Sequence, residues 1–445
     1  MAHQLGQGVG AGGRGRWHRA ARLTAAATAV ALLAAACGGG SSGAKTATAP
    51  VGNGQTASSA GSATDGGGTP GGATSSSSSA APPMVLTANP VDGTKGADPA
   101  KGIQISTAGG KLESVVATDA GGKTVAGAMA ADGSSWTSTG TLAISSSYTV
   151  TAKAQDGSGA EKTTTSKFTT LSPEKRLGLS HYAPDDGMTV GVGQPVAVYF
   201  TNPPNSKNRD AVEKAMTVTT TPHVDGAWSW VSATEADWRP QNYWQPGTKV
   251  KVHMGLNGVK AGDVTYGSFT KDFAFTIGDA VISTVDLMKD KMTVTKNGQV
   301  LRVIPVSAGE VPRHPTWSGK MVVLEKDASL QMTSASVNFT DASDFYDLPV
   351  KDAVKITDSG TFLHAAPWNA GKFGHVNGSH GCIGMGSDDA AWFFSQVKVG
   401  DVVDVQKSAN TKDNVTTNPM PGFDDWNLSW DQWLKNSAAG VQTAQ

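Results

Sequence analysis

The chain contains 445 residues, which at about 150 residues per domain predicts roughly three domains. Its 36 basic and 37 acidic side chains give a formal net charge of -1, which excludes a nucleic-acid-binding role, because that role needs a clustered basic surface to displace counterions. Glycine is frequent (54 residues), charged residues make up only 16%, and the two cysteines, Cys37 and Cys382, are too few for a disulfide scaffold, so we expect sandwiches, turns and linkers rather than helical bundles.

Residues 1–36 are typical of an export signal. Arginines between positions 14 and 22 precede an apolar run of about 14 residues at 23–36, which is too short to cross a bilayer as a helix. The run resembles a bacterial lipoprotein signal, which is cleaved directly before a cysteine that becomes lipid-modified, although Ala34 stands where such signals usually have leucine. A plain secretory signal is the alternative. A cysteine at this boundary favours lipidation of Cys37, and therefore a protein anchored to the outer face of the plasma membrane, in the extracytoplasmic cell envelope.

Residues 37–83 consist almost entirely of glycine, serine, alanine, threonine and proline, and they contain no aromatic side chain. Such a segment cannot bury enough apolar surface to offset the entropy lost on ordering it, so we expect a disordered tether. A flexible chain of this length has a typical reach of about 35–40 Å.

Two β-rich modules follow, at 84–171 and 172–278. Short alternating runs recur about every 8–12 residues with glycine, aspartate and serine clusters between them, a pattern that predicts β-sandwiches. In the first module we expect strands at 103–105, 112–117, 141–144, 148–154 and 166–170. In the second we expect strands at 195–200, 216–220, 249–254 and 269–276.

Tryptophans mark the interiors of both modules. We interpret Trp136, Trp228 and Trp230 as packing residues, because they stand in alternating apolar runs. The string at 238–244 has a more exposed character. It is either a strip on which carbohydrate stacks or a loop packed against a neighbouring domain, and the second interpretation is favoured.

From residue 279 to residue 407 the sequence predicts a third, mostly β domain with little helix. Asn297-Gly298 is a strong two-residue hairpin signal between two of its strands. A helix should begin after Ser387, which offers an N-cap ahead of acidic residues in the first turn. We expect strands at 281–286, 291–296, 300–307, 321–325, 360–364 and 402–406.

The C-terminal extension, at 408–445, contains Trp426, Trp430 and Trp433 at helical spacing. They would occupy one face of a short helix, and three tryptophans are too costly to leave in water. Acidic neighbours disfavour an anionic membrane surface, so we expect this face to pack on the domain at 279–407.

Chemistry is concentrated around Cys382. A thiol becomes a useful nucleophile when an imidazole takes its proton or a positive charge lowers its pKa. His380 stands two residues before the thiol, and His364 ends a predicted strand upstream, so the residues alone leave either as the base. Gly381 and Gly384 leave the backbone uncrowded, as a loop whose N–H groups approach an oxyanion requires. A buried, inert cysteine beside a surface histidine is the alternative.

His364 followed by Ser379-His380-Gly381-Cys382 resembles the signature of L,D-transpeptidases with the YkuD fold. The resemblance covers nearly the whole chain and includes the lipoprotein-type start. It implies a mainly β protein with two immunoglobulin-like β-sandwich modules, a YkuD-type catalytic domain and a short helical C-terminal extension.

The resemblance also implies a role for each matching residue. Cys382 is the nucleophile and His364 is the general base, oriented by the main-chain carbonyl of Ala365. His380 lies beside the thiol and helps to polarise the substrate carbonyl, and the Gly381 N–H contributes to the oxyanion hole.

Substrate contacts are implied less sharply. They fall on Ser379, Trp368, Gly384 and Tyr346. Gly384 departs from the family, which commonly has asparagine two residues after the cysteine. The segment that covers the active site should lie between residues 330 and 346, where three aromatic side chains qualify for its contact residue: Phe339, Phe345 and Tyr346.

The reaction implied is acyl transfer between peptidoglycan stem peptides. Cys382 attacks the third residue of a tetrapeptide stem, expels the terminal D-Ala, and passes the acyl group to the third residue of a neighbouring stem. Carbapenem β-lactams should acylate the same thiol. Hydrolysis by water, transfer that anchors a protein to the stem, or a non-catalytic peptidoglycan-binding lipoprotein are the alternatives. The nine histidines show no metal-ligand spacing, so we expect neither a metal nor another cofactor.

Overall fold

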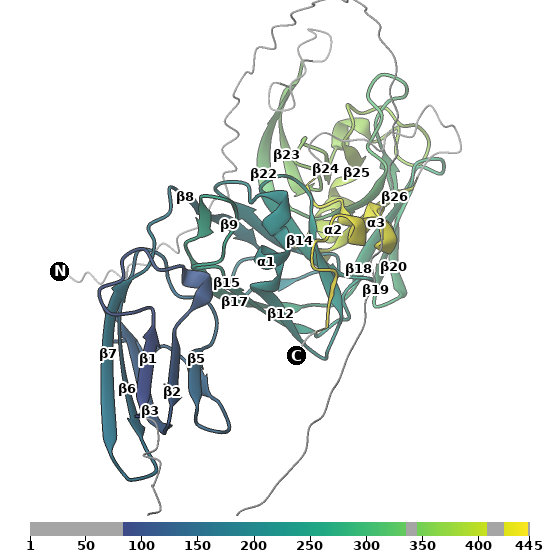
Figure 1. Ribbon diagram of the computed structural model, residues 1–445. Coiled ribbons are helices and arrows are strands. Elements are labelled where there is room, and N and C mark those ends of the chain that lie inside the picture. Colours follow the sequence, from purple (N-terminus) through teal and green to yellow (C-terminus); the bar gives the residue numbers. More distant parts are fainter. Residues whose placement is uncertain (1–82, 335–344, 407–421, 444–445) are drawn as a thin grey trace, which may run out of the picture. The chain divides into compact units, whose positions relative to one another are not determined.

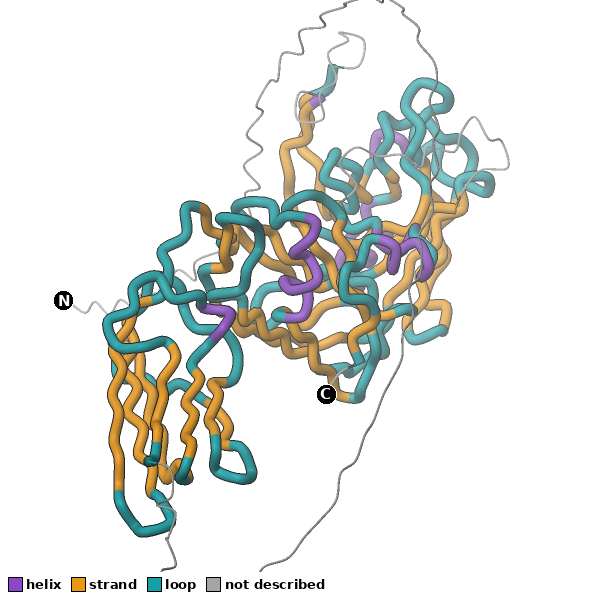
Figure 2. The backbone as a smooth tube through the Cα atoms, viewed as in Figure 1, coloured by secondary structure: helices purple, strands orange, loops and turns teal. Residues whose placement is uncertain are grey.

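The computed structural model describes residues 83–334, 345–406 and 422–443. The export signal, nearly all of the tether, Cys37 and Phe339 lie outside these residues. The described residues belong to one compact unit, Ser78–Gln445, in which strands predominate over helices (Figure 2). No helix in this described part is both long enough and apolar enough to cross a membrane.

The first module is a sandwich of two antiparallel sheets (Figure 1). A cluster that includes Ile103, Ile105, Trp136 and Phe168 fills the space between them, as expected for Trp136. The expected strand at 141–144 is wrong: the segment is a loop, and its buried side chains follow from packing rather than from sheet pairing. The sheets are β1 (Val85–Asn89), β2 (Gln104–Ala108), β5 (Ser135–Ser138) and β4 (Gly127–Met129), and β3 (Lys111–Asp119), β6 (Ser147–Gln155) and β7 (Glu161–Thr169).

The second module is a larger sandwich with its own core, in which Trp228 and Trp230 are buried as predicted. The exposed character expected at 238–244 holds only for Gln241 and Asn242, because Trp238 lies within a central strand and Trp244 stacks on it with 5.3 Å between ring centroids. One sheet contains β10 (Thr189–Val190), β17 (Thr270–Ile277), β15 (Lys249–Gly255) and β12 (Met216–Thr221). The other contains β27 (Val441–Gln442), β13 (Gly226–Trp230), β14 (Glu235–Pro240), β11 (Val196–Phe200) and β9 (Leu179–Ala183).

Short elements complete this module. The strands β8 (Lys175–Leu177) and β16 (Thr265–Gly267) form a parallel pair, and helix α1 spans Arg209–Lys214.

A nine-stranded sheet forms the third part. Asn297 (φ 50°) and Gly298 (φ 81°) make the expected hairpin turn between β19 and β20. The order across the sheet is β21 (Gly319–Val322), β26 (Val402–Gln406), β18 (Val281–Asp286), β19 (Lys291–Lys296), β20 (Gln299–Ser307), β25 (Ile383–Met385), β24 (Phe362–Ala365), β23 (Asp347–Lys355) and β22 (Glu325–Thr333).

Helix α2 (Ser387–Gln396) packs against β23 and β24 and buries Ala390 and Phe393. Ser387 lies inside the helix and does not cap it, because the N-cap position belongs to Gly386. Acidic residues do occupy the first turn, as expected.

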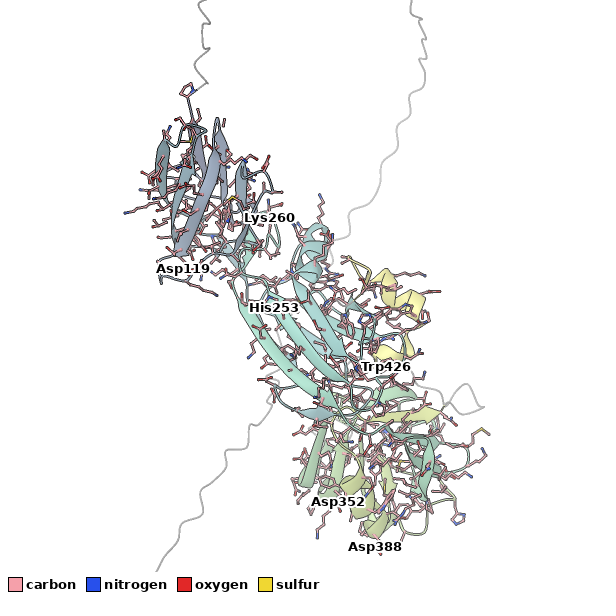
Figure 3. All side chains as sticks on the ribbon, turned by 90° about the horizontal axis from the view of Figure 1, so that it is seen from below. Asp119, His253, Lys260, Asp352, Asp388 and Trp426 are labelled. Atoms are coloured by element: carbon pink, nitrogen blue, oxygen red, sulfur yellow. The ribbon has the colours of Figure 1, made fainter. Side chains whose placement is uncertain are left out.

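The C-terminal tryptophans do not share one helix. A 3-10 turn at Asp425–Asn427 ends at Leu428, and α3 (Trp430–Lys435) starts afresh from a capping box in which Ser429 and Gln432 bond each other's backbone amides. The expected packing partner is also largely wrong: Trp433 donates its indole N–H to Ala227 O of the second module, and Trp426 (labelled in Figure 3) donates to Gly193 O of that module.

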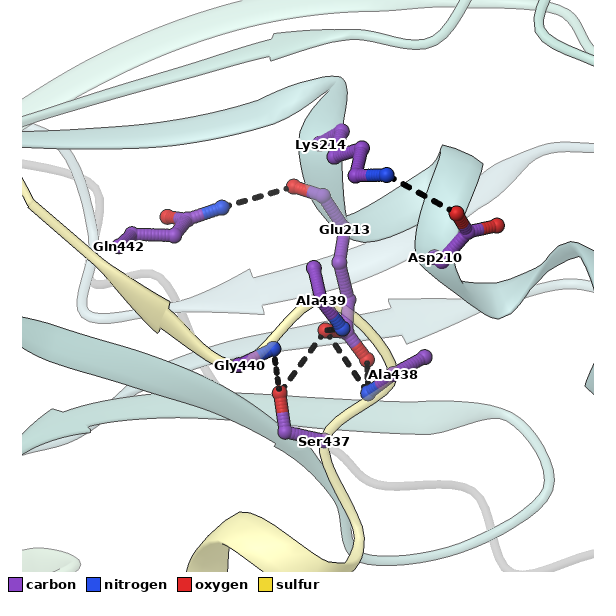
Figure 4. A network of polar contacts seen from close by, with 8 residues as sticks. All are labelled: Asp210, Glu213, Lys214, Ser437, Ala438, Ala439, Gly440 and Gln442. Carbon is purple, nitrogen blue, oxygen red and sulfur yellow. Dashed lines mark hydrogen bonds and ion pairs between the residues drawn. The ribbon is translucent and has the colours of Figure 1, made fainter.

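A buried carboxylate holds the last part of this segment on the second module (Figure 4). Glu213 of α1 is fully buried and accepts from the backbone amides of Ala438 and Ala439, from Ser437 Oγ and from the indole N–H of Trp230. Strand β27 then pairs with β13.

Candidate active site

The site forms where β24 and β25 run parallel in the nine-stranded sheet. Leu363 pairs with Ile383, and His364 pairs with Gly384. Side chains two residues apart on a strand share a face, so the register places His364 and Cys382, which directly precedes β25, on the same face of neighbouring chain segments. Residues separated in the sequence by a long crossover are thereby brought together.

The imidazole of His364 is buried and held by a backbone carbonyl. Its side chain is 6% exposed, and its Nδ1 lies 2.8 Å from Ala365 O. A carbonyl only accepts hydrogen bonds, so Nδ1 carries a proton, and in the neutral imidazole Nε2 then keeps its lone pair. Burial lowers the pKa of His364, and the bond to Ala365 offsets only part of that effect.

Cys382 is a partly exposed, free thiol whose Sγ lies 3.8 Å from Gly360 O. It packs beside a cluster formed by β22, β23 and their neighbours, which includes Met332, Tyr346 and Phe362. This apolar environment raises the pKa of Cys382 to about 11. Both pKa changes favour a neutral thiol and a neutral imidazole.

The loop before the thiol is fixed by polar contacts. Gly381 has φ +113°, a conformation that a side chain rarely permits. Ser379 Oγ donates to Cys382 O at 2.6 Å and accepts from Gly381 N at 3.2 Å, so the Gly381 amide already has a partner within the loop. Thr316 Oγ1 donates to Gly381 O at 2.9 Å from a different loop.

His380 is exposed and lies between loops that carry other rings. Its imidazole is 5.3 Å from the ring of Tyr346 and 4.8 Å from the ring of His314. Among the covering aromatics, Phe345 is 73% exposed and Phe339 lies outside the described residues, so Tyr346 is the one that the structure places at the site.

The remaining sequence candidates border the site. Trp368 is 53% exposed, and its ring stacks at 6.0 Å from that of His364. Gly384 lies in the sheet between β20 and β24, and a Cβ there would be 2.9 Å from the Cβ of Ala366. Ala366 thus occupies the space into which a side chain at 384 would begin to grow.

Thr316 and His314 were missed by the sequence analysis. Both belong to the loop between β20 and β21, where Pro312-Arg313-His314-Pro315 follows the end of a predicted strand. A histidine in a proline-bounded loop after a strand is only a weak indication of a functional residue. It does not show which other loop the histidine will contact. In the part of the chain described by the structure, no group of three or more His, Cys, Asp or Glu side chains is arranged to hold a metal ion.

The fold combines two β-sandwich modules with a nine-stranded sheet that brings a free cysteine and a buried histidine onto neighbouring segments. Residues 280–405 match the YkuD model, the L,D-transpeptidase catalytic domain, and residues 94–260 match a bacterial Ig domain. The chain is 37% identical over 357 residues to L,D-transpeptidase 2 of Mycobacterium tuberculosis (strain CDC 1551 / Oshkosh), covering 79% of this chain and 85% of that one. The chain belongs to the L,D-transpeptidase family.

A second relative agrees with this assignment. L,D-transpeptidase 5 of Mycobacterium tuberculosis (strain ATCC 25618 / H37Rv) is 31% identical over 360 residues, which covers 79% of this chain and 77% of that protein. A solved structure of the L,D-transpeptidase LdtMt1 in complex with imipenem is 35% identical, covers 52% of this chain and 99% of that chain, and has a TM-score of 0.45.

Proposed function

We propose that this L,D-transpeptidase cross-links peptidoglycan stem peptides through a thioester on Cys382. The observation that supports it best is the neutral His364, fixed by Ala365 O on the same sheet face as the thiol. An imidazole with a free Nε2 can accept the thiol proton as the sulfur attacks, so no permanent thiolate is required.

The first half-reaction is acylation. Cys382 Sγ bonds to the carbonyl carbon of the third residue of a donor tetrapeptide, and its proton passes to His364 Nε2. The C–N bond to the terminal D-Ala then breaks, and the departing amine takes the proton from His364. His380 supports the developing charge on the carbonyl oxygen.

The second half-reaction returns the enzyme. The side-chain amine of the third residue on a neighbouring stem attacks the thioester carbon, the C–S bond breaks, and the proton lost by the amine returns through His364 to the sulfur. The product is an amide between third residues. Water as the acceptor would give an L,D-carboxypeptidase, and an amine of a protein would give an anchoring transferase.

The support for transfer over simple binding is chemical. A binding module has no use for a cysteine flanked by an exposed imidazole and a buried imidazole held in one tautomer. We further propose that lipidation at Cys37 holds the enzyme at the outer face of the plasma membrane, with residues 38–83 as the tether; the lipoprotein-like start supports this.

The test is an intact-mass and product assay with the purified protein. With a disaccharide-tetrapeptide as donor and acceptor, the wild type should form dimers, and Cys382→Ala should reduce dimer formation by more than about 10³-fold. Imipenem should add once to the wild type and not to the variant. Equal melting temperatures serve as the folding control. Dimers formed by Cys382→Ala, or an adduct mapped to another residue, would contradict the proposal.

A further inference from the structure

The loop between β20 and β21 is built onto the catalytic loop. Ser379 N donates to Ala308 O at 2.9 Å, and Glu310 N donates back to Ser379 O at 2.8 Å, which makes a short parallel bridge between the two segments. Thr316 Oγ1 extends this contact, since it accepts from Gly309 N and donates to Gly381 O. The loop between β20 and β21 and the loop that carries Ser379 therefore move together.

His314 occupies a fixed place in this loop. Its amide donates to Glu310 O at 2.6 Å, and its carbonyl lies so close to Gly309 that a Cβ there would be 1.9 Å away. The side chain is half-buried, whereas its neighbour His380 is exposed. The rings lie 4.8 Å apart with 34° between their planes, within the range of favourable aromatic pairs.

We propose that His314 is a positioning residue for His380. This inference rests on the proposed function, in which the His380 imidazole faces the carbonyl that Cys382 attacks. An exposed ring in a glycine-flanked loop has several rotamers, and packing on a fixed neighbour narrows that set. His314 thus acts on acylation through His380, without contacting the reacting atoms itself.

The expected effect is modest and selective. An aromatic pair of this kind corresponds to about a 2- to 10-fold change in rate when its contribution is lost. His314→Ala should slow acylation of the full-length protein by imipenem by that factor, because a carbonyl must be polarised. It should leave alkylation of Cys382 by iodoacetamide unchanged, because that reaction needs only the thiolate.

Three further variants separate packing from other causes. His314→Phe keeps an aromatic ring and should restore most of the acylation rate. His223→Ala, an exposed histidine paired with Asp225 on the second module, should match the wild type. In a His380→Ala background, His314→Ala should cost nothing more, since the residue through which it acts is gone.

The results of these experiments distinguish a failure of the role proposed for His314 from a failure of the proposed function. Wild-type acylation rates in His314→Ala, equal slowing of acylation and alkylation, a Phe variant as slow as the Ala variant, or additive losses in the double variant would each overturn the role of His314. A wild type that is acylated but forms no cross-link overturns the proposed function alone, because this comparison uses only acylation. A wild type that imipenem never acylates overturns both.

Discussion

At the scale of single residues, the resting states of Cys382 and His364 distinguish two ways to activate a thiol. Some cysteine enzymes keep a thiolate–imidazolium pair ready before substrate arrives. Here burial raises the pKa of Cys382 to about 11 and lowers the pKa of His364, so both changes oppose such a pair. In the proposed reaction, transfer of the thiol proton must then accompany the attack of Cys382 on the carbonyl, and electrophiles that do not assist this transfer should react slowly.

This gives a prediction about His364. The midpoint of Cys382 alkylation against pH should lie above the free-thiol value of about 8.5 in the wild type. It should not rise in His364→Ala, because no imidazolium stabilises the thiolate. Acylation by imipenem should nevertheless fall by about 10²–10⁴-fold, the usual effect of removing a general base. A wild-type midpoint below 8.5 that rises in His364→Ala would instead reveal a resting ion pair.

Which residues of the candidate site can be predicted from the sequence depends on how far apart they lie along the chain. Cys382, His380 and Ser379 are neighbours in one motif, and His364 has a family spacing to them, so the sequence alone groups all four as candidates. Thr316 and His314 touch the motif only because β20 pairs with β25 and carries its following loop to Ser379. The pairing of β20 with β25 is a long-range contact, which no local sequence pattern predicts.

At the scale of elements, the sequence predicted the bounds of strands in which apolar and polar residues alternate. It did not predict how the C-terminal helix packs. The expected bounds of Val281–Asp286, Lys291–Lys296 and Val402–Gln406 agree with the structure. The tryptophan spacing in the C-terminal extension suggested one helix, but Ser429 and Gln432 form a capping box that starts a new helix between Trp426 and Trp430. The capping box at Ser429 thus determined where the helix begins, in spite of the helical spacing of the tryptophans.

The three tryptophans nevertheless share a partner. The guanidinium of Arg239, which is buried, lies over the rings of Trp426, Trp430 and Trp433 at 4.6, 5.5 and 4.5 Å and donates to Leu428 O. A planar cation can face several rings at once without losing its hydrogen bonds. This explains how a broken helix still gathers the tryptophans that one continuous face was expected to present.

Glu213 provides a prediction for this C-terminal segment. Glu213→Gln replaces one acceptor oxygen by an NH₂ group that faces other donors, so the backbone amide of Ala438 or Ala439 loses its partner. We expect the free energy of unfolding to fall by about 1–3 kcal/mol, measured by urea denaturation. Asp210→Asn, on the same helix but exposed beside Lys214, should change it by about 0.5 kcal/mol or less. Equal stability of the two variants would show that the buried carboxylate is not needed.

At the scale of the whole molecule, the second module and the nine-stranded sheet share apolar and backbone contacts. Ala197, Val322, Phe423 and Trp426 form one buried cluster to which both parts and the C-terminal segment contribute. Gly193 N donates to Gly400 O at 2.8 Å, and Gly191 N donates to Val399 O at 2.8 Å. The module boundaries at 171/172 and 278/279 remain predictions, although each part has its own core.

Asp401 lies in this contact region and is fully buried. A Cβ added to Gly191 would be 2.2 Å from its Oδ1, so the second module packs directly on the carboxyl group. Its Oδ2 accepts from Lys398 N at 2.7 Å, and Lys398 Nζ lies 3.7 Å from Oδ1. Burial outweighs these contacts and raises the pKa of Asp401 from 3.8 to about 7.

The pH dependence of stability follows from that shift. Between pH 3.8 and about 7 the folded chain holds a proton on Asp401 that the unfolded chain has released, so unfolding releases a proton and stability falls as pH rises through this window.

Asp401→Asn keeps a neutral side chain of the same shape and removes this loss of stability. Its stability relative to the wild type should therefore rise from pH 4 to pH 7 and level off above, with a total gain of about 4 kcal/mol, because the pKa is raised from 3.8 to about 7 at about 1.4 kcal/mol per pKa unit. Other titrating groups are common to both proteins and cancel in the difference, and Asp388→Asn, exposed on α2, is the matched control. Urea denaturation at pH 4.5, 6 and 8 measures the difference, and a constant value across the three pH values would mean that Asp401 is charged in the folded protein throughout.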